Sequence, residues 1–221
     1  MNPSAGTPSI PQQARPTNKA AALAKARDKD GRTYYYEGLL GSDGREGAWT
    51  VDGRWSVIEP YLDLRPTDHA LDLGCAEGLI TLEIARRVAS VHGVEIQPQR
   101  VAAARRIARR QGVANATFEE GSVVDHPIET KGYDVVFCLG VIQHLHGGDV
   151  PPTVDRLVAA ARRSVVIRAP FFRRSRMDLL GHCVNAIGRA GEGPRGKFKV
   201  RMVRCEGGIG GDFLVADRPE A

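Results

Sequence analysis

The sequence predicts an α/β protein built on a mostly parallel sheet. An apolar segment that ends at Leu73 is followed by a glycine-rich turn and then by apolar residues at helical spacing. A second apolar segment ends at Glu95, and Pro98 opens another helical pattern. Strand and helix patterns keep alternating as far as Arg168. Such alternation is typical of βαβ units, whose strands run parallel and whose helices cover the sheet.

The composition is that of one globular domain with appendages. The chain has 221 residues, of which 42% are hydrophobic, and a formal net charge of +5. That charge is compatible with an anionic substrate or with nucleic acid, and equally with a solvated charged surface. The segment 1–30 is rich in proline, serine, alanine and lysine, which predicts a disordered tail.

No sequence feature predicts export or membrane insertion. The N-terminal segment lacks an apolar core of the secretory type, and the chain contains no apolar run of about 18 residues. The four cysteines are widely spaced, without a C-x-x-C pair, and are interpreted as reduced thiols. We therefore expect a cytoplasmic protein with no membrane partner.

The first βαβ unit begins with a strand over 70–73 and a helix over 78–88. Gly74 permits a sharp turn after the strand, and we expect the missing side chain at Gly78 to let a ligand approach the main chain. The helix then points its N-terminus at whatever occupies the turn. The dinucleotide pattern G-x-G-x-x-G is a poor fit, because Ala76 and Leu79 occupy two of its glycine positions.

A different spacing fits the turn better. From Asp72 to Gly78 the chain reads acidic-x-G-x-A-x-G, so that only the middle glycine of acidic-x-G-x-G-x-G is replaced, by Ala76. This stretch resembles motif I of the class I S-adenosylmethionine (SAM)-dependent methyltransferases. The second strand, Ser90–Glu95, ends in a carboxylate whose two oxygens can accept both hydroxyls of a ribose. Because NAD folds share that feature, Glu95 indicates a nucleoside without saying which one.

The rest of the chain supplies the other elements of the sheet. The helix from Pro98 has a buried stripe of Val101, Ala104 and Ala108, with its arginines mostly outside it. The further elements are strands over 116–120, 133–139 and 164–168, a helix over 153–161, and a closing pair of strands over 197–204 and 212–216. The resemblance implies a Rossmann-like, seven-stranded, mostly parallel sheet with helices on both faces and an antiparallel C-terminal hairpin.

The same resemblance divides the chain and assigns a cofactor. It implies a disordered tail over 1–30, a cap over 31–64 and a SAM-dependent methyltransferase domain over 65–221. The tyrosines at 34–36 then belong either to a lid over the pocket or to aromatic packing outside the core. The residues expected to contact SAM are Asp72, Gly74, Cys75, Ala76, Gly78, Glu95, Ile96, Ser122, Val123 and Leu139. Ser122 stands where the family often has an aspartate, and its hydroxyl can also accept a hydrogen bond.

Two histidines after the fourth strand are the candidate catalytic residues. Imidazole titrates near neutrality, so His144 is the first candidate for a general base and His146 the second; either could instead cap a helix or bind a carbonyl. Two histidines alone rarely form a metal site. The ends of the fourth and fifth strands, Cys138-Leu139 and Ala169-Pro170, also lack acidic metal ligands. No metal is therefore predicted.

The leading interpretation is metal-independent methyl transfer from SAM to oxygen, nitrogen or carbon of a small molecule. An anionic acceptor is favoured if the arginines after the fifth strand bind it. One alternative is an RNA methyltransferase that uses the basic C-terminal third, and another is a SAM-binding scaffold without turnover. The sequence predicts neither the acceptor nor the oligomeric state.

Overall fold

The computed structural model describes residues 24–27, 33–36, 55, 58–169, 177–190, 199–203 and 212–218. The strands are Ala24–Arg27 (β1), Thr33–Tyr36 (β2), His69–Leu73 (β3), Ser90–Glu95 (β4), Ala116–Glu120 (β5), Tyr133–Leu139 (β6), Ala161–Ala169 (β7), Lys199–Val203 (β8) and Asp212–Asp217 (β9). The α-helices are Leu79–Ala85 (α2), Pro98–Arg110 (α3), Val150–Ala160 (α4) and Met177–Ala190 (α5), and the 3₁₀ helices are Glu59–Tyr61 (η1) and Ile142–His144 (η2).

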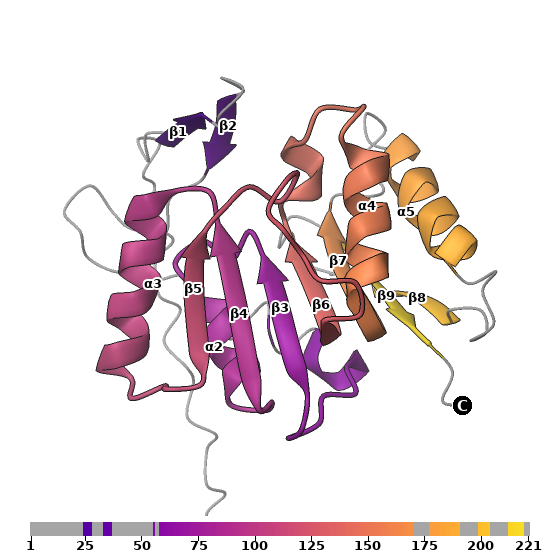
Figure 1. Ribbon diagram of the computed structural model, residues 1–221. Helices are drawn as coiled ribbons and strands as arrows, with labels where there is room; N and C mark the ends of the chain where they lie inside the picture. Colours follow the sequence, from indigo (N-terminus) through magenta and orange to yellow (C-terminus); the bar gives the residue numbers. More distant parts are fainter. Residues whose placement is uncertain are drawn as a thin grey trace, which may run out of the picture.

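The centre of the molecule is a seven-stranded sheet in the order β5-β4-β3-β6-β7-β9-β8 (Figure 1). Strands β3 to β7 pair in parallel, and β9 runs antiparallel to both β7 and β8. The predicted Rossmann-like sheet and its antiparallel closing hairpin are therefore confirmed. The chain adds β4 and β5 on one side of β3 and then crosses to β6 on the other side, which makes β3 the point where the strand order reverses.

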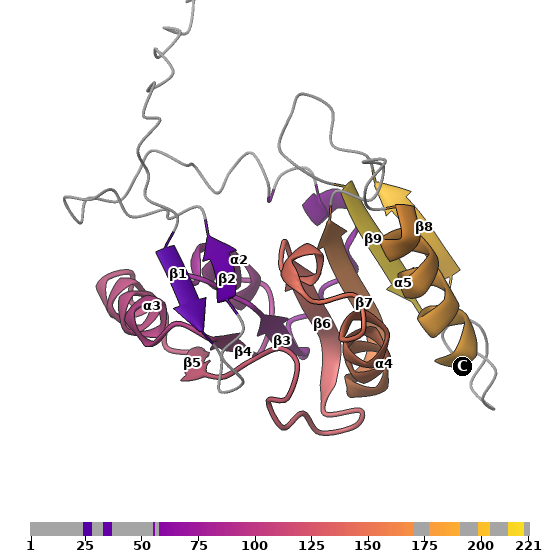
Figure 2. The same cartoon turned by 90° about the horizontal axis from the view of Figure 1, so that it is seen from above.

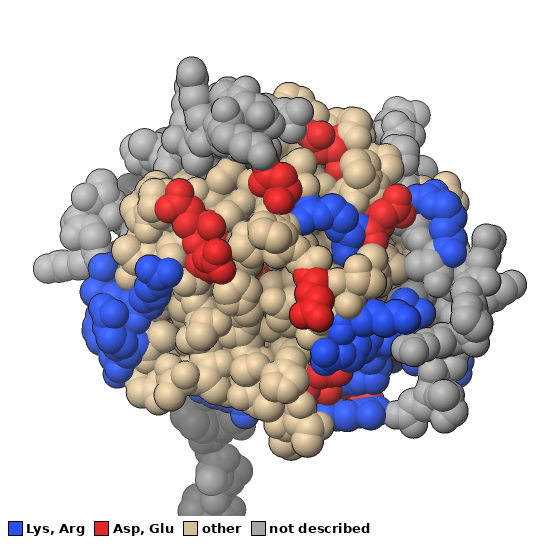
Figure 3. Space-filling model, in the orientation of Figure 1, with Lys and Arg blue, Asp and Glu red and all other residues tan. Residues whose placement is uncertain are grey.

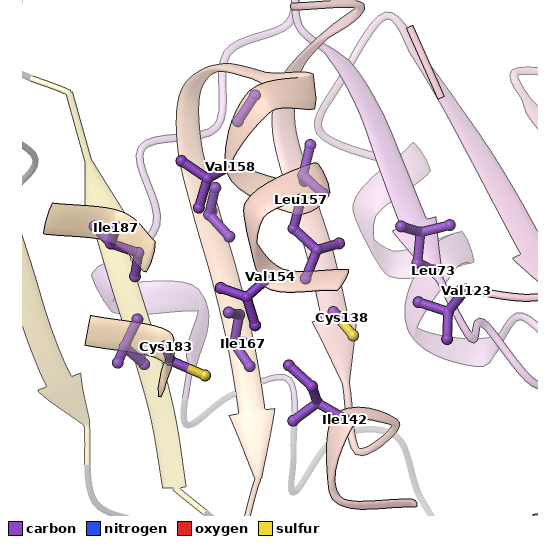
Figure 4. Packing of buried hydrophobic residues seen from close by; sticks show 14 of the residues in the cluster. Leu73, Val123, Cys138, Ile142, Val154, Leu157, Val158, Ile167, Cys183 and Ile187 are labelled. Atoms are coloured by element: carbon purple, nitrogen blue, oxygen red, sulfur yellow. The ribbon is translucent and has the colours of Figure 1, made fainter. Parts of the chain in front are cut away.

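Helices cover both faces of the sheet, as predicted (Figure 2). Helices α4 and α5 pack on one face, where Val154 and Leu157 lie against Ile167 of β7 and Cys183 and Ile187 extend the same cluster (Figure 4). Helices α2 and α3 pack on the other face, around Phe118 of β5. The run Val135–Cys138 in β6 is buried on both sides, which explains why it is continuously apolar.

Several elements differ from the predictions at their ends or in their type. Helix α2 ends at Ala85 rather than 88, and α4 already begins at Val150, with the two prolines in its first turn, where missing N–H groups cost nothing. Helix α5 was not predicted. In β8, Val200 is 40% exposed, and Val203 is the residue that is buried.

The described part of the N-terminal segment contains a strand. Strand β1 lies inside the segment 1–30 that was expected to be disordered, and it pairs antiparallel with β2 in a separate two-stranded sheet. The side chains of the three tyrosines and the rest of the expected cap up to 54 lie outside the described residues, as do the arginines between 170 and 176. Among the helices described here, none combines the length and apolar character needed to span a membrane.

Candidate functional site

The candidate site lies where β3 ends and the turn to α2 begins, beside the reversal of strand order. Ligands of open α/β sheets bind at such a point, outside the carboxyl ends of the strands. The N–H groups of Gly74 and Cys75 both donate to the carbonyl of Val94, at 2.7 and 3.1 Å. The turn after β3 is therefore fastened over the end of β4, and the two strand ends form one floor.

The turn needs an unusual backbone at three positions. Gly74, Ala76 and Gly78 have φ angles of 79°, 51° and 77°, a region that favours glycine. A Cβ atom on Gly74 would lie 2.1 Å from Cγ2 of Val141, and one on Gly78 would lie 2.6 Å from the ring of Phe118. Both glycines thus serve close packing within the protein. For Gly78 this differs from the expected reason, which was the approach of a ligand to the main chain.

Glu95, at the end of β4, stabilises the turn through hydrogen bonds to its backbone. Its Oε2 accepts the N–H of Ala76 and its Oε1 accepts the N–H of Gln97, each at 3.0 Å. A carboxylate has lone pairs for about four hydrogen bonds, so both oxygens can still accept from a ligand hydroxyl. Burial raises the pKa of Glu95 and Glu77 adds to this, while the two N–H groups and Arg100 lower it. The carboxylate is fixed at the end of β4, in the place predicted for ribose binding.

A buried ion pair behind the turn was not predicted. Arg100 was expected on the solvent side of α3, but only 6% of it is exposed, and its Nε lies 3.4 Å from Oε1 of Glu77. Among the described residues, the buried Oε2 of Glu77 and Nε2 of Gln97 have no hydrogen-bond partner. One feature of the sequence could have indicated this ion pair: Glu77 lies inside the glycine turn, and an acid that is buried there requires a nearby cation.

Asp72, at the end of β3, is also buried. Thr81 of α2 donates to its Oδ2 at 2.6 Å. Burial, together with the negative charge of Glu95, raises the pKa of Asp72 to about 6 against the lowering effect of the Thr81 hydrogen bond. Arg100 neutralises Glu77, so Asp72 and Glu95 leave the turn negatively charged. Such a site attracts a cationic ligand and repels the pyrophosphate of a dinucleotide. This adds a physical reason to the spacing argument against NAD.

The turn after β5 closes one side of the site. The N–H of Gly121 donates to the carbonyl of Glu95 at 3.0 Å, which joins this turn to the floor. The hydroxyl of Ser122 accepts the N–H of Val124 at 3.2 Å and keeps a second lone pair. Val123 is buried, and Ile96 packs against the same hydrophobic cluster. The structure therefore brings these predicted contact residues together next to Glu95.

Cys75 contributes through the backbone rather than through its side chain. Its thiol is buried in the cluster on the α2 and α3 side of the sheet, and the Sγ lies 2.9 Å from the position of a Cβ on Gly93. Burial raises the pKa of this thiol well above its usual range. The Cys75 carbonyl accepts the N–H of Gly78 at 2.9 Å. This residue therefore shapes the turn and does not offer a nucleophile to it.

The opposite side of the site is the end of β6. Leu139, which is partly buried, ends the strand, and Val141 packs against Gly74. His144 ends η2, is exposed, and its Nε2 lies 3.2 Å from Nε2 of Gln143. His146 is also exposed, and its carbonyl accepts the Asp149 N–H. The contact through Val141 places η2 on the same edge as the turn, and the catalytic role of either histidine stays a prediction.

The fold and this turn are those of a doubly wound nucleoside-binding protein, and comparison with known proteins shows which part of the chain resembles a methyltransferase. Residues 70–164 match the family model described as a methyltransferase domain. The matched region includes the turn after β3, Glu95, Ser122 and both candidate histidines. The match covers 95 of the 221 residues and is consistent with a class I SAM-dependent methyltransferase domain.

Solved structures of methyltransferases share this fold. Magnesium protoporphyrin IX methyltransferase from Synechocystis PCC 6803, with bound SAH, has a TM-score of 0.59 at 19% identity, covering 76% of this chain and 80% of that one. A SAM-dependent methyltransferase from Aquifex aeolicus has a TM-score of 0.56 at 15% identity, covering 76% and 90%. These identities support the fold alone.

The curated relatives match a shorter stretch. A 23S rRNA (uracil(1939)-C(5))-methyltransferase from Salmonella choleraesuis (strain SC-B67) is 38% identical over 96 residues, covering 38% of this chain. The corresponding protein from Klebsiella pneumoniae is 50% identical over 58 residues, covering 26% of this chain and 13% of that protein. The chain spans 22% of the length of the Salmonella relative.

Proposed function

We propose that this protein binds SAM in the turn after β3 and transfers its methyl group to a small molecule. The observation that carries the proposal is the pair of buried carboxylates, Asp72 and Glu95, at a turn whose backbone is fastened to β4. SAM bears a sulfonium and an ammonium group, so its charge complements this site. Glu95 would accept the ribose hydroxyls, and Ser122 would contact the adenine edge.

Methyl transfer from SAM requires the protein mainly to position the two reactants. When bound, SAM supplies a methyl carbon already activated by its sulfonium. A lone pair of the acceptor forms the new bond to this carbon while the carbon–sulfur bond breaks and its electrons stay on sulfur. His144, at the end of η2, would take the acceptor's proton where one is released, and His146 is the second candidate. Holding the reactants in line can supply roughly 7 kcal/mol of the barrier. No metal at the reacting atoms is required.

Arg168 supports an anionic acceptor. It lies near the carboxyl end of β7, is 7% exposed, and its guanidinium is 3.5 Å from the position of a Cβ on Gly140. A guanidinium fixed beside the end of β6 can bind a carboxylate or phosphate in two-point fashion. Of the arginines predicted for this role, those between 170 and 176 lie outside the described residues.

RNA is the second candidate acceptor, because the curated relatives are named as 23S rRNA methyltransferases. Figure 3 shows Lys and Arg in separate groups, one over α3 and others on the right of the view, with acidic residues and uncharged surface between them. A continuous basic stripe, which is the usual footprint for nucleic acid, is not formed on this face by the described residues. The described cysteines are buried with raised pKa values, which disfavours thiolate chemistry on a base.

Calorimetry with the Glu95→Gln variant tests the cofactor part. Loss of a charged acceptor for the ribose should weaken SAM binding about 10-fold or more. Glu129→Gln, an exposed residue in the β5–β6 connection, is the matched control and should bind as the wild type does. Thermal unfolding checks that both variants are folded. Unchanged SAM affinity in a folded Glu95→Gln protein would refute the assignment.

Radiolabelled methyl-SAM with fractionated cell extract tests the acceptor. We expect label in the small-molecule fraction and its loss with His144→Asn. Label in RNA instead, together with RNA binding that falls steeply with salt, would favour the second candidate. Tight binding of SAM and of its demethylated product without any transfer would indicate the non-catalytic scaffold.

A further inference from the structure

One face of the sheet is left open beside the site. The residues at 121–132 join β5 to β6 without a helix, so on the side of α4 and α5 no described helix covers β4 or β5 (Figure 1). The register pairs His92 with Thr117 and Val94 with Glu119. Because paired residues of parallel strands point to the same face, these four side chains lie on the same face, where Val94 is buried next to Gly121 and the other three lie beyond it.

Three potential metal ligands meet there. Each of His92, Glu119 and His126 offers one possible ligand atom, and these three atoms lie within 4.8 Å of one another. Nε2 of His92 is 3.4 Å from Oε2 of Glu119, and the rings of His92 and His126 stack with their centroids 6.2 Å apart. The residues come from two strands and a turn, so their proximity depends on the sheet register and not on sequence spacing.

The hydrogen bonds around His92 leave a nitrogen lone pair directed at this cluster. Nδ1 of His92 lies 2.9 Å from the hydroxyl of Thr117, which can accept from Nδ1 while it donates its own proton to the carbonyl of Val91, 3.5 Å away. With the proton on Nδ1, Nε2 carries the lone pair and faces Glu119.

We propose that His92, Glu119 and His126 bind a divalent transition metal ion, with Zn²⁺ the best match. Two imidazoles and one carboxylate are a typical zinc ligand set, with water as the fourth ligand. Tetrahedral bonds of zinc place ligand atoms about 3.4 Å apart, so small side-chain rotations from the present separations complete the site. The bond from His92 to Thr117 is the kind of supporting contact that orients a metal-binding histidine.

The metal would fasten the turn after β5 to the sheet. The N–H of His126 donates to the carbonyl of Ser122 at 2.8 Å, and its ring lies against Gly121, where an added Cβ would come within 2.4 Å of Nδ1. Zinc bound to His126 and to the two strands therefore restrains the segment that carries Ser122. The site is separate from the proposed methyl transfer and does not depend on it.

Titration of the tag-free protein with Zn²⁺ in competition with a chromophoric chelator tests the site. We expect one tight site per chain, a rise in Tm on zinc addition, and the visible absorption of tetrahedral Co²⁺ on substitution. Glu119→Gln is the main variant, because this side chain is 57% exposed and its replacement should leave the fold intact. Loss of one ligand should lower the affinity by more than the roughly 10–100-fold expected for Thr117→Val, which removes only the supporting bond.

His69→Asn is the matched control, since His69 is an exposed strand histidine that also bonds a hydroxyl, that of Ser90 at 2.7 Å. It should bind zinc as the wild type does. His126→Asn should lose the site as Glu119→Gln does. The proposal is overturned if no tight site is found, or if binding survives in Glu119→Gln and His126→Asn but disappears when His144 and His146 are both replaced.

Discussion

Replacement of Asp72 by asparagine should make the ligand-free protein more stable at neutral pH. Asp72 is buried and largely ionised at pH 7, and the hydroxyl of Thr81 donates a hydrogen bond to it. Asparagine has nearly the same shape, and its carbonyl oxygen can still accept from Thr81. The substitution therefore removes a buried charge while keeping the contact.

The size of the effect follows from the pKa of Asp72. Burial raises this pKa from its ordinary value of 3.8 to about 6. Two such units correspond to about 3 kcal/mol at 1.36 kcal/mol each, an upper limit on the stabilisation in Asp72→Asn. The folded state binds the proton more tightly than the unfolded state. Asp72 therefore costs nothing below pH 3.8, and its cost grows as the pH rises to about 6.

Urea unfolding of the wild type and Asp72→Asn at pH 7.5 and pH 4.5, followed by tryptophan fluorescence, measures this. The stability difference between the proteins should shrink by about 2 kcal/mol at the lower pH, because the wild-type carboxyl is then largely protonated. Comparing the two proteins cancels the titration of other groups. A difference that is the same at both pH values would refute the reasoning.

Three further substitutions test the turn and a buried ion pair at the opposite end of β3 by urea or thermal unfolding. Ala76→Gly should stabilise the protein by about 0.5 kcal/mol, because relief of a left-handed φ costing roughly 1–2 kcal/mol outweighs the added chain entropy, and destabilisation would contradict this. Gly78→Ala should cost at least about 2 kcal/mol through the clash with Phe118, and an unchanged Tm would be the contrary result. Arg163→Met should lower the free energy of unfolding by about 3 kcal/mol, because Asp68 is then buried without its cation. Adding Asp68→Asn should recover much of this loss. If the double variant is no more stable than Arg163→Met, the buried pair does not explain the loss.

The sheet was predictable because each central strand has a recognisable pattern in its own local sequence. Ser90–Glu95, Ala116–Glu120 and Tyr133–Leu139 were predicted with the limits that the structure has. Apolar runs bounded by glycine, proline or charged residues fix such strands without reference to the rest of the chain. The turn at Asp72–Gly78 was recognisable for the same reason, since its glycines meet a backbone requirement.

What escaped prediction depends on contacts between distant segments. Arg100 looks like any other arginine of α3 until the fold places Glu77 beside it. Helix α5 has apolar residues at 179, 183 and 187, but Gly181 and Gly188 and the basic segment before it obscured the helical pattern. The His92 cluster requires the β4–β5 register, because its members lie on different elements. Sequence spacing carries no such information.

Retaining a buried charge that costs stability is understandable if the ligand is a cation. Bound SAM would offset the charge of Asp72, so Asp72→Asn should bind SAM more weakly although its ligand-free form is more stable. The demethylated product lacks the sulfonium charge, and its affinity should fall less. Calorimetry of both ligands with both proteins at pH 7.5 separates this from a loss of shape, because a distorted turn would weaken both ligands equally. Equal losses would mean that Asp72 supports the turn and does not recognise charge.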